Sequence, residues 1–234
     1  MNPLALRPIL SHLAKAHEEL ARLFARLQFI VFGEVVDERV KGWAETVAQD
    51  ERTSPLDERT LFLSLARAYR HLNIAWNCRH ASEERVRRCA PADFKRWSNF
   101  PEDAVFRDLW PAPSRCRGTP RKPRGRIEPN SLQAAFLQMG VRKLRILCYR
   151  IAQTLGDDSP RTITRPKGLR SGIEKEPFTE SEFARRMHRI YSELNTAWVY
   201  RKRTRGEELS RQTIRRHRQF PSGFLSAIAS GVVP

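Results

Sequence analysis

One motif occurs twice in this chain, at a constant offset of 122 residues. The first copy reads Tyr69-x-x-Leu72-Asn73-x-Ala75-Trp76-x-x-Arg79, and the second reads Tyr191-x-x-Leu194-Asn195-x-Ala197-Trp198-x-x-Arg201. The apolar members recur at steps of three and four residues, which places them on one face of an α-helix. A motif that returns at a fixed offset indicates a repeated structural unit. The predicted fold is all-α, with two related helical bundles that arise from an internal duplication.

The repeat extends beyond the motif and sets the predicted domain boundaries. Lys95-Arg96-x-x-x-Phe100-Pro101 returns as Arg215-Arg216-x-x-x-Phe220-Pro221, at an offset of 120. Between the copies, residues 111–130 hold five prolines and two glycines, which disfavour both helix and strand. We therefore predict one bundle over residues 1–110, a basic linker over 111–130 and a second bundle over 131–234. Each bundle, of about 100 residues, is large enough to bury its own core.

Hydrophobic periodicity and capping signals predict helices in both copies, and the alternation typical of strands is almost absent. In the first copy the predicted helices cover Leu4–Val31, Asp37–Ala48, Glu58–Arg79, Glu83–Arg88 and Ala92–Asn99. In the second copy they cover Ser131–Leu155, a segment from Thr179 to about Arg205, and Glu207–Gln219. Asp57 and Thr179 are the expected N-caps of the two motif helices, and Glu182 completes a capping-box spacing after Thr179.

The residues shared by the two copies are most simply explained as scaffold. We expect the tyrosine, leucine, alanine and tryptophan of each motif to pack the helix onto its neighbours, rather than to lie exposed and stack on bases. Asparagine is a mediocre helix former, so Asn73 and Asn195 predict a specific hydrogen bond, such as one to a backbone group of a neighbouring loop. Arg79 and Arg201 are placed to complement the dipole at the helix C-terminus. Each Phe-Pro pair is expected to close its unit.

The two copies differ sharply in charge. Residues 1–112 contain 17 Lys and Arg against 16 Asp and Glu, a net charge of +1, whereas residues 113–234 contain 26 against 10, a net charge of +16. Arginine supplies most of the excess, and its planar guanidinium suits bidentate contacts with phosphate. This distribution predicts that DNA or RNA binds the linker and the second copy through its phosphate backbone. The predicted nucleic-acid-binding residues are Arg121, Lys122, Arg124, Arg126, Arg201, Lys202, Arg203, Arg205, Arg211, Arg215, Arg216 and Arg218.

Other functions stay open beside this one. A helical adaptor with a basic face for an acidic protein fits the same composition, and the near-neutral first copy is expected to dock on a protein partner or on the second copy. The stretch 210–217 resembles the start of a helix-turn-helix recognition helix. Arg211-x5-His217 also falls within the Arg-to-His spacing of HEPN-type ribonucleases, which are helical bundles, although the first copy has Pro91 and Trp97 at the matching positions. We predict a non-enzymatic protein, with a HEPN-like ribonuclease as a minor alternative.

The cysteines do not form a pattern typical of a metal site. Cys78, Cys89, Cys116 and Cys148 include no CxxC pair, and a zinc site drawn through Cys78, His80 and Cys89 has no counterpart in the second copy. We predict no metal or other cofactor, and free thiols as in a reducing cytosol. Charged residues interrupt the apolar stretch of residues 20–32, and no apolar run reaches about 18 residues. We therefore expect a cytoplasmic protein that does not enter a membrane.

Overall fold

The computed structural model describes residues 4–35, 56–101, 131–156 and 177–202. Most of these residues are helical, and none of them forms an extended strand, so the prediction of an all-α fold is confirmed for this part of the chain. The elements are α1 (Leu6–Phe32), α4 (Glu58–Asn77), α5 (Glu83–Arg88), α6 (Pro91–Ser98), α8 (Ser131–Leu155), α9 (Glu180–Val199) and the 3₁₀ turn η2 (Tyr200–Lys202).

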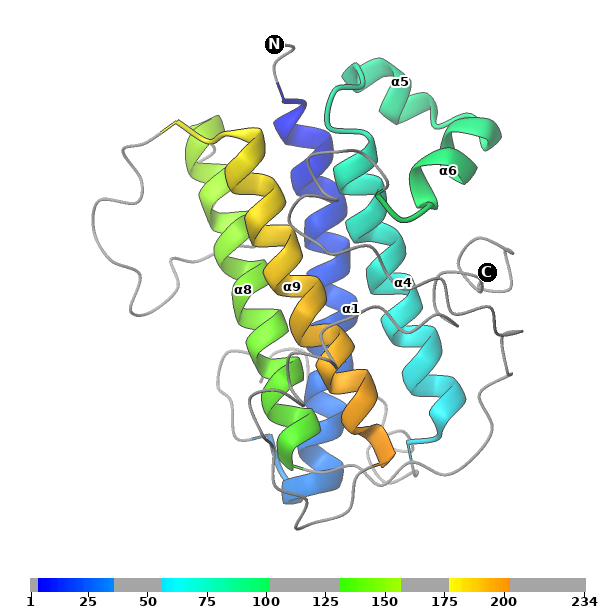
Figure 1. The fold of residues 1–234 in the computed structure, drawn as a ribbon, viewed down its shortest axis with the longest axis vertical. Helices are drawn as coiled ribbons and strands as arrows, with labels where there is room; N and C mark the ends of the chain where they lie inside the picture. The colour runs from blue at the N-terminus through cyan, green and yellow to red at the C-terminus, as the bar shows by residue number, and fades with distance from the viewer. Residues whose placement is uncertain (1–3, 36–55, 102–130, 157–176, 203–234) are drawn as a thin grey trace.

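The four long helices form a bundle in which neighbouring helices run in opposite directions (Figure 1). Helix α1 packs against α4 and α8, and α9 packs against α8 and α4. The start of α1 lies at the end of α4, where the Ala5 amide donates to the Arg79 carbonyl oxygen at 2.7 Å. Helices α5 and α6 lie beside the C-terminal half of α4 (Figure 1), and Trp97 of α6 is buried against Ile74 and Cys78 of α4.

One hydrophobic core runs through all four long helices. Among its fully buried members are Leu13 of α1, Leu65 of α4, Leu144 of α8 and Ile190 of α9. Burial of one such side chain contributes about 1.5–3 kcal/mol, so the shared core is the main force that holds the helices together. Helices of both copies therefore contribute to the same core, and the predicted linker over residues 111–130 lies outside the described residues.

The ends of the helices follow local signals in the sequence. Asp57 Oδ1 accepts the Thr60 amide at 2.6 Å at the start of α4, and Thr179 Oγ1 accepts the Glu182 amide at 3.1 Å at the start of α9. Both predicted N-caps are confirmed. Helices α1 and α8 each end before a glycine in the left-handed region, Gly33 (φ 78°) and Gly156 (φ 64°), where other residues would be strained.

Most predicted helix bounds agree with the structure within two residues, but the second motif helix is shorter than predicted. Helix α9 ends at Val199, six residues before the predicted end near Arg205. A long-range contact accompanies this earlier end: Tyr200 is fully buried and stacks on Phe136 of α8 with ring centroids 5.4 Å apart, and the chain continues as η2. The predicted helices Asp37–Ala48 and Glu207–Gln219 lie outside the described residues.

Candidate functional site

The two copies of the motif meet at the centre of the α4–α9 contact. The rings of Tyr69 and Tyr191 stack there, with centroids 5.5 Å apart. Tyr191 Oη donates to Asn73 Oδ1 at 2.6 Å, and Tyr69 Oη donates to Asn195 Oδ1. Burial raises the pKa of both phenols well above the usual value, so each hydroxyl stays protonated and acts as a donor. Each tyrosine thus bonds the asparagine of the other copy.

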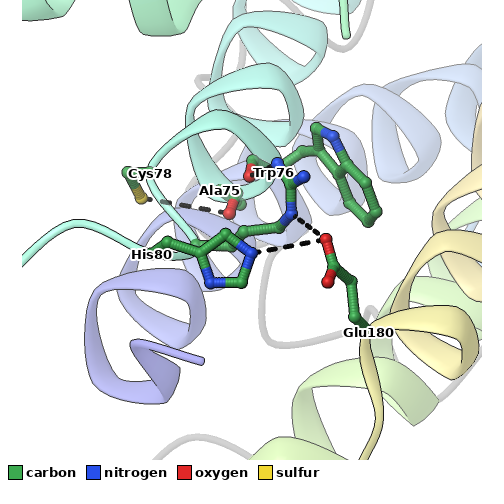
Figure 2. Close-up of polar contacts among 6 residues, drawn as sticks. Ala75, Trp76, Cys78, His80 and Glu180 are labelled. Atoms are coloured by element: carbon green, nitrogen blue, oxygen red, sulfur yellow. Dashed lines mark hydrogen bonds and ion pairs between the residues drawn. The ribbon is translucent and has the colours of Figure 1, made fainter. Parts of the chain in front are cut away.

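At the ends of the same contact, two arginine–glutamate bonds join the copies, one in each direction. Arg201 Nε donates to Glu58 Oε1 at 2.8 Å, and Arg79 Nε donates to Glu180 Oε1 at 2.6 Å. The glutamates begin α4 and α9, and they lie 122 residues apart, as the motif residues do. Sequence reasoning missed them, although this shared offset is a signal that would have found them. Figure 2 shows Glu180 reaching towards the end of α4.

Each motif arginine is also held by its own helix. The guanidinium carbon of Arg79 lies 4.2 Å from the centre of the Trp76 ring, and that of Arg201 lies 3.8 Å from the Trp198 ring. Each arginine donates to the carbonyl oxygen of the same tryptophan, at 3.1 and 2.9 Å. Such stacking stabilises by about 0.5–2 kcal/mol. The predicted role of both arginines at the helix C-terminus is confirmed.

The remaining shared residues also serve the scaffold. The tyrosine, leucine, alanine and tryptophan of both motifs are buried, so the predicted packing role is confirmed and the stacking alternative is wrong for them. Asn73 Nδ2 donates to the Ser98 carbonyl oxygen at 2.8 Å, which confirms a specific bond to a backbone group, although Ser98 ends helix α6 and does not lie in a loop. The bond described for Asn195 is to the Tyr69 side chain instead. Phe100 meets Tyr191 edge-on at 5.7 Å and packs against the core, as expected for a residue that closes the unit.

Of the twelve predicted nucleic-acid-binding residues, only Arg201 and Lys202 lie within the described residues, and only the Arg201 side chain is placed. Its guanidinium is held by Glu58 and by Trp198, as described above. The other ten lie outside the described residues: Arg121, Lys122, Arg124, Arg126, Arg203, Arg205, Arg211, Arg215, Arg216 and Arg218. The structure therefore tests the prediction at Arg201 alone, and there the guanidinium is engaged within the bundle.

Basic side chains of the second copy are exposed on the bundle itself. Arg142 of α8 and Arg185 and Arg189 of α9 are exposed to solvent. Lys143 beside them pairs with Glu193, which is only 3% exposed. The bundle surface of the second copy thus adds positive charge that sequence reasoning did not assign to a site.

Cys78 and His80, near the end of α4, contact other groups of the protein. Cys78 Sγ contacts the Ala75 carbonyl oxygen at 3.9 Å, and His80 Nε2 lies 3.4 Å from Glu180 Oε1 (Figure 2). Burial raises the pKa of Cys78 and of Cys148 to about 12, so both are thiols at neutral pH. Within the described ranges, no group of three or more His, Cys, Asp or Glu side chains could hold a metal ion.

A pair of histidines joins α1 to α4. Their Nδ1 atoms, in His12 and His71, lie 3.3 Å apart. The pKa of each is lowered to about 4, mainly by burial and to a lesser extent by nearby charges that include Lys15. Both rings are therefore neutral at pH 7, and one Nδ1 can donate to the other.

Comparison of the chain with protein-family models, curated proteins and solved structures found no match. None of the described helices is both long enough and apolar enough to span a membrane.

Proposed function

We propose that this chain is a non-enzymatic nucleic-acid-binding protein, or a subunit of a ribonucleoprotein or defence-type complex. The observation that carries the proposal is the division of charge, +1 over residues 1–112 and +16 over residues 113–234. Solubility alone does not require that the positive charge be concentrated in one half of the chain. A strongly positive region does attract the phosphate backbone of a nucleic acid, which releases its counterions when it binds there.

An internal duplication supplies the scaffold in this proposal. Its support is the reciprocity of the contacts: tyrosine to asparagine, and arginine to glutamate, each in both directions between α4 and α9. Two identical chains that associate about a two-fold axis make paired contacts of this kind. Because the shared residues are used in this contact, they are not available to a ligand, and the residues that differ between the copies carry the binding.

Phosphate contacts are assigned to the basic linker and to the stretch after η2. The linker alone carries six Lys and Arg against one Glu over residues 111–130. Arg201 is the first residue of the second basic stretch, and its side chain bonds Glu58 at the start of α4. The exposed arginines of α8 and α9 extend the positive surface onto the bundle. The first copy, close to neutral, is assigned to a protein partner, and a cytoplasmic location is part of the same proposal.

The test is a variant with the ten basic residues other than Arg201 and Lys202 changed to glutamine. Arg201 is left in place because Glu58, which is 3% exposed, depends on it. Binding to labelled single-stranded and duplex oligonucleotides is measured by fluorescence anisotropy at about 50 and about 200 mM salt. The wild type should lose affinity steeply as salt rises, with a slope of about 0.7–0.9 in log–log form for each phosphate contact, and the variant should bind weakly with a shallow slope.

The matched control neutralises exposed basic residues of the first copy. Arg59, Arg87 and Arg88 are exposed there, and their change to glutamine should leave the salt slope nearly intact. Undiminished binding by the ten-residue variant would refute the proposal. Partners that stay cross-linked after nuclease treatment would favour the helical adaptor instead. Metal-independent RNA cleavage that is lost in His217→Ala would favour the ribonuclease.

A further inference from the structure

One further pair of residues is identical in the two copies and takes no part in the contacts described above. Besides the motif residues and the glutamates Glu58 and Glu180, helices α4 and α9 share Arg67 and Arg189, at the same offset of 122. Both arginines are exposed to solvent. Neither forms a hydrogen bond or an ion pair with another residue that the structure describes. The scaffold therefore does not explain why the two copies are alike at this position.

Exposed positions on these two helices are free to differ. Two positions within the helices are exposed in both copies. At one of them Arg59 of α4 corresponds to Ser181 of α9, whereas at the other both helices have arginine. A substitution at an exposed position that makes no bonds has little effect on stability, so folding does not require arginine in both places. A role at the surface is what remains for Arg67 and Arg189.

The carboxylates of the same helices are engaged within the bundle. Helices α4 and α9 contain four glutamates, and each of them pairs with a basic side chain. The pairs are Glu58 with Arg201, Glu180 with Arg79, Glu182 with Arg186 and Glu193 with Lys143. The positive charge of the two exposed arginines is therefore not neutralised by a carboxylate of its own helix.

The two arginines occupy equivalent places about the α4–α9 contact. Each lies two residues before the stacked tyrosine of its helix, Tyr69 or Tyr191. The reciprocal arginine–glutamate bonds join the end of each helix to the start of the other, so the helices run antiparallel. Such paired contacts relate the two helices by an approximate two-fold axis. A ligand that presents the same anionic group repeatedly can meet both arginines in the same way.

We propose that Arg67 and Arg189 each bind a phosphate of the same nucleic acid, so that both copies of the repeat make an equal contact with its backbone. A nucleic-acid backbone repeats one phosphate per nucleotide, and a guanidinium binds phosphate through two parallel N–H groups. This inference rests on the proposed function and adds to it a contact made by residues that the copies share. Net charge alone assigns binding to Arg189, in the basic half of the chain, and none to Arg67.

The test measures binding of the full chain to fluorescein-labelled oligo(dT) of about 16 nucleotides and to a duplex of the same length. The ligand that the wild type binds more tightly is used for the variants. Arg67→Gln and Arg189→Gln should each weaken binding about tenfold at about 50 mM salt and lower the log–log salt slope by about 0.7–0.9, the effect of losing one phosphate contact. The double variant should show about twice the change in slope. Arg67→Lys and Arg189→Lys keep the charge and should retain most of the binding.

Arg59→Gln is the matched control, because Arg59 is also exposed on α4 but has a serine as its counterpart in the second copy. It should leave affinity and salt slope nearly unchanged. Urea denaturation followed by circular dichroism should give the same midpoint for Arg67→Gln, Arg189→Gln and the wild type, because both arginines are exposed. A lower midpoint in either variant would show that its arginine stabilises the fold, which contradicts the proposal.

The outcomes distinguish this inference from the proposed function. If Arg67→Gln binds like the wild type while Arg189→Gln and the ten-residue variant lose affinity, the equal contact by both copies is refuted and the nucleic-acid function stands. If both single variants bind as well as Arg59→Gln, the inference is refuted in the same way. If the wild type binds neither oligonucleotide at low salt, both proposals fail. If the two variants weaken binding of poly-glutamate but not of the oligonucleotides, the arginines contact a protein and the inference is overturned.

Discussion

The two arginine–glutamate pairs at the ends of the α4–α9 contact allow a direct comparison, because both arginines stack on a tryptophan while the two glutamates differ in burial. In Arg79→Met and in Arg201→Met the same stacking on tryptophan and the same bond to its carbonyl oxygen are lost. Those losses cost about 2 kcal/mol of unfolding free energy in each variant. The difference between the variants therefore reports on the glutamate that loses its arginine.

The burial of the glutamate determines how much unfolding free energy is lost when its arginine is removed. The Glu58 side chain is 3% exposed, whereas the Glu180 side chain is 23% exposed and also lies near His80. Removal of one member of a buried pair costs about 3–5 kcal/mol, but a partly exposed carboxylate recovers water and costs about 1 kcal/mol or less. We expect Arg201→Met to be less stable than Arg79→Met by about 2 kcal/mol.

Urea denaturation followed by circular dichroism measures this difference at pH 7. A second change tests the cause: Glu58→Gln in the Arg201→Met background should recover about 1–2 kcal/mol, because a neutral amide is cheaper to bury than a carboxylate. Glu180→Gln in the Arg79→Met background should recover little. Equal stabilities of the two arginine variants, or no recovery with Glu58→Gln, would refute the reasoning.

Three further predictions follow from the buried groups. Tyr191→Phe should lower the unfolding free energy by about 1–3 kcal/mol in thermal or urea melts, because Asn73 Oδ1 loses a buried donor, and a loss below about 0.5 kcal/mol would contradict that role. Cys78 and Cys148 should stay unlabelled by iodoacetamide in the native protein at pH 8 and react after unfolding, as peptide mass mapping would show. Burial lowers the pKa of His12, His17 and His71 to about 4 in the folded state, below the ordinary 6.5, so the unfolded state binds more protons between these values. Unfolding free energy should therefore fall as the pH drops from about 6.5 towards 4, and His17→Gln should flatten this dependence in pH-dependent urea melts.

Much of the secondary structure could be predicted from local signals. The caps at Asp57 and Thr179 and the glycines after α1 and α8 act within a few residues, so the sequence contains all that is needed to place those ends. The end of α9 could not be placed in the same way. It depends on the burial of Tyr200 against Phe136, a residue more than sixty positions away in the chain.

The helix that packs against the buried face of the motif could also not be predicted from local sequence patterns. Periodicity shows that Tyr69 and Trp76 share a buried face, but it does not say which helix covers that face. In the structure, the same face of the other copy packs against it. This contact also explains the roles of Asn73 and Glu58. Likewise, the end of α4 and the short helix α5 lie between Arg70 and Phe94 in the sequence, and the packing of α6 beside α4 brings the two side chains together.

The most direct test of the central claim is recovery of nucleic acid that copurifies with the full chain. The wild type and the ten-residue glutamine variant are purified in parallel at about 50 and about 200 mM salt, and bound nucleic acid is extracted and sequenced. DNA or RNA should be recovered with the wild type at the lower salt, should be largely released at the higher salt, and should be nearly absent from the variant. Recovery of equal amounts with both proteins, or of none with the wild type at low salt, would contradict it.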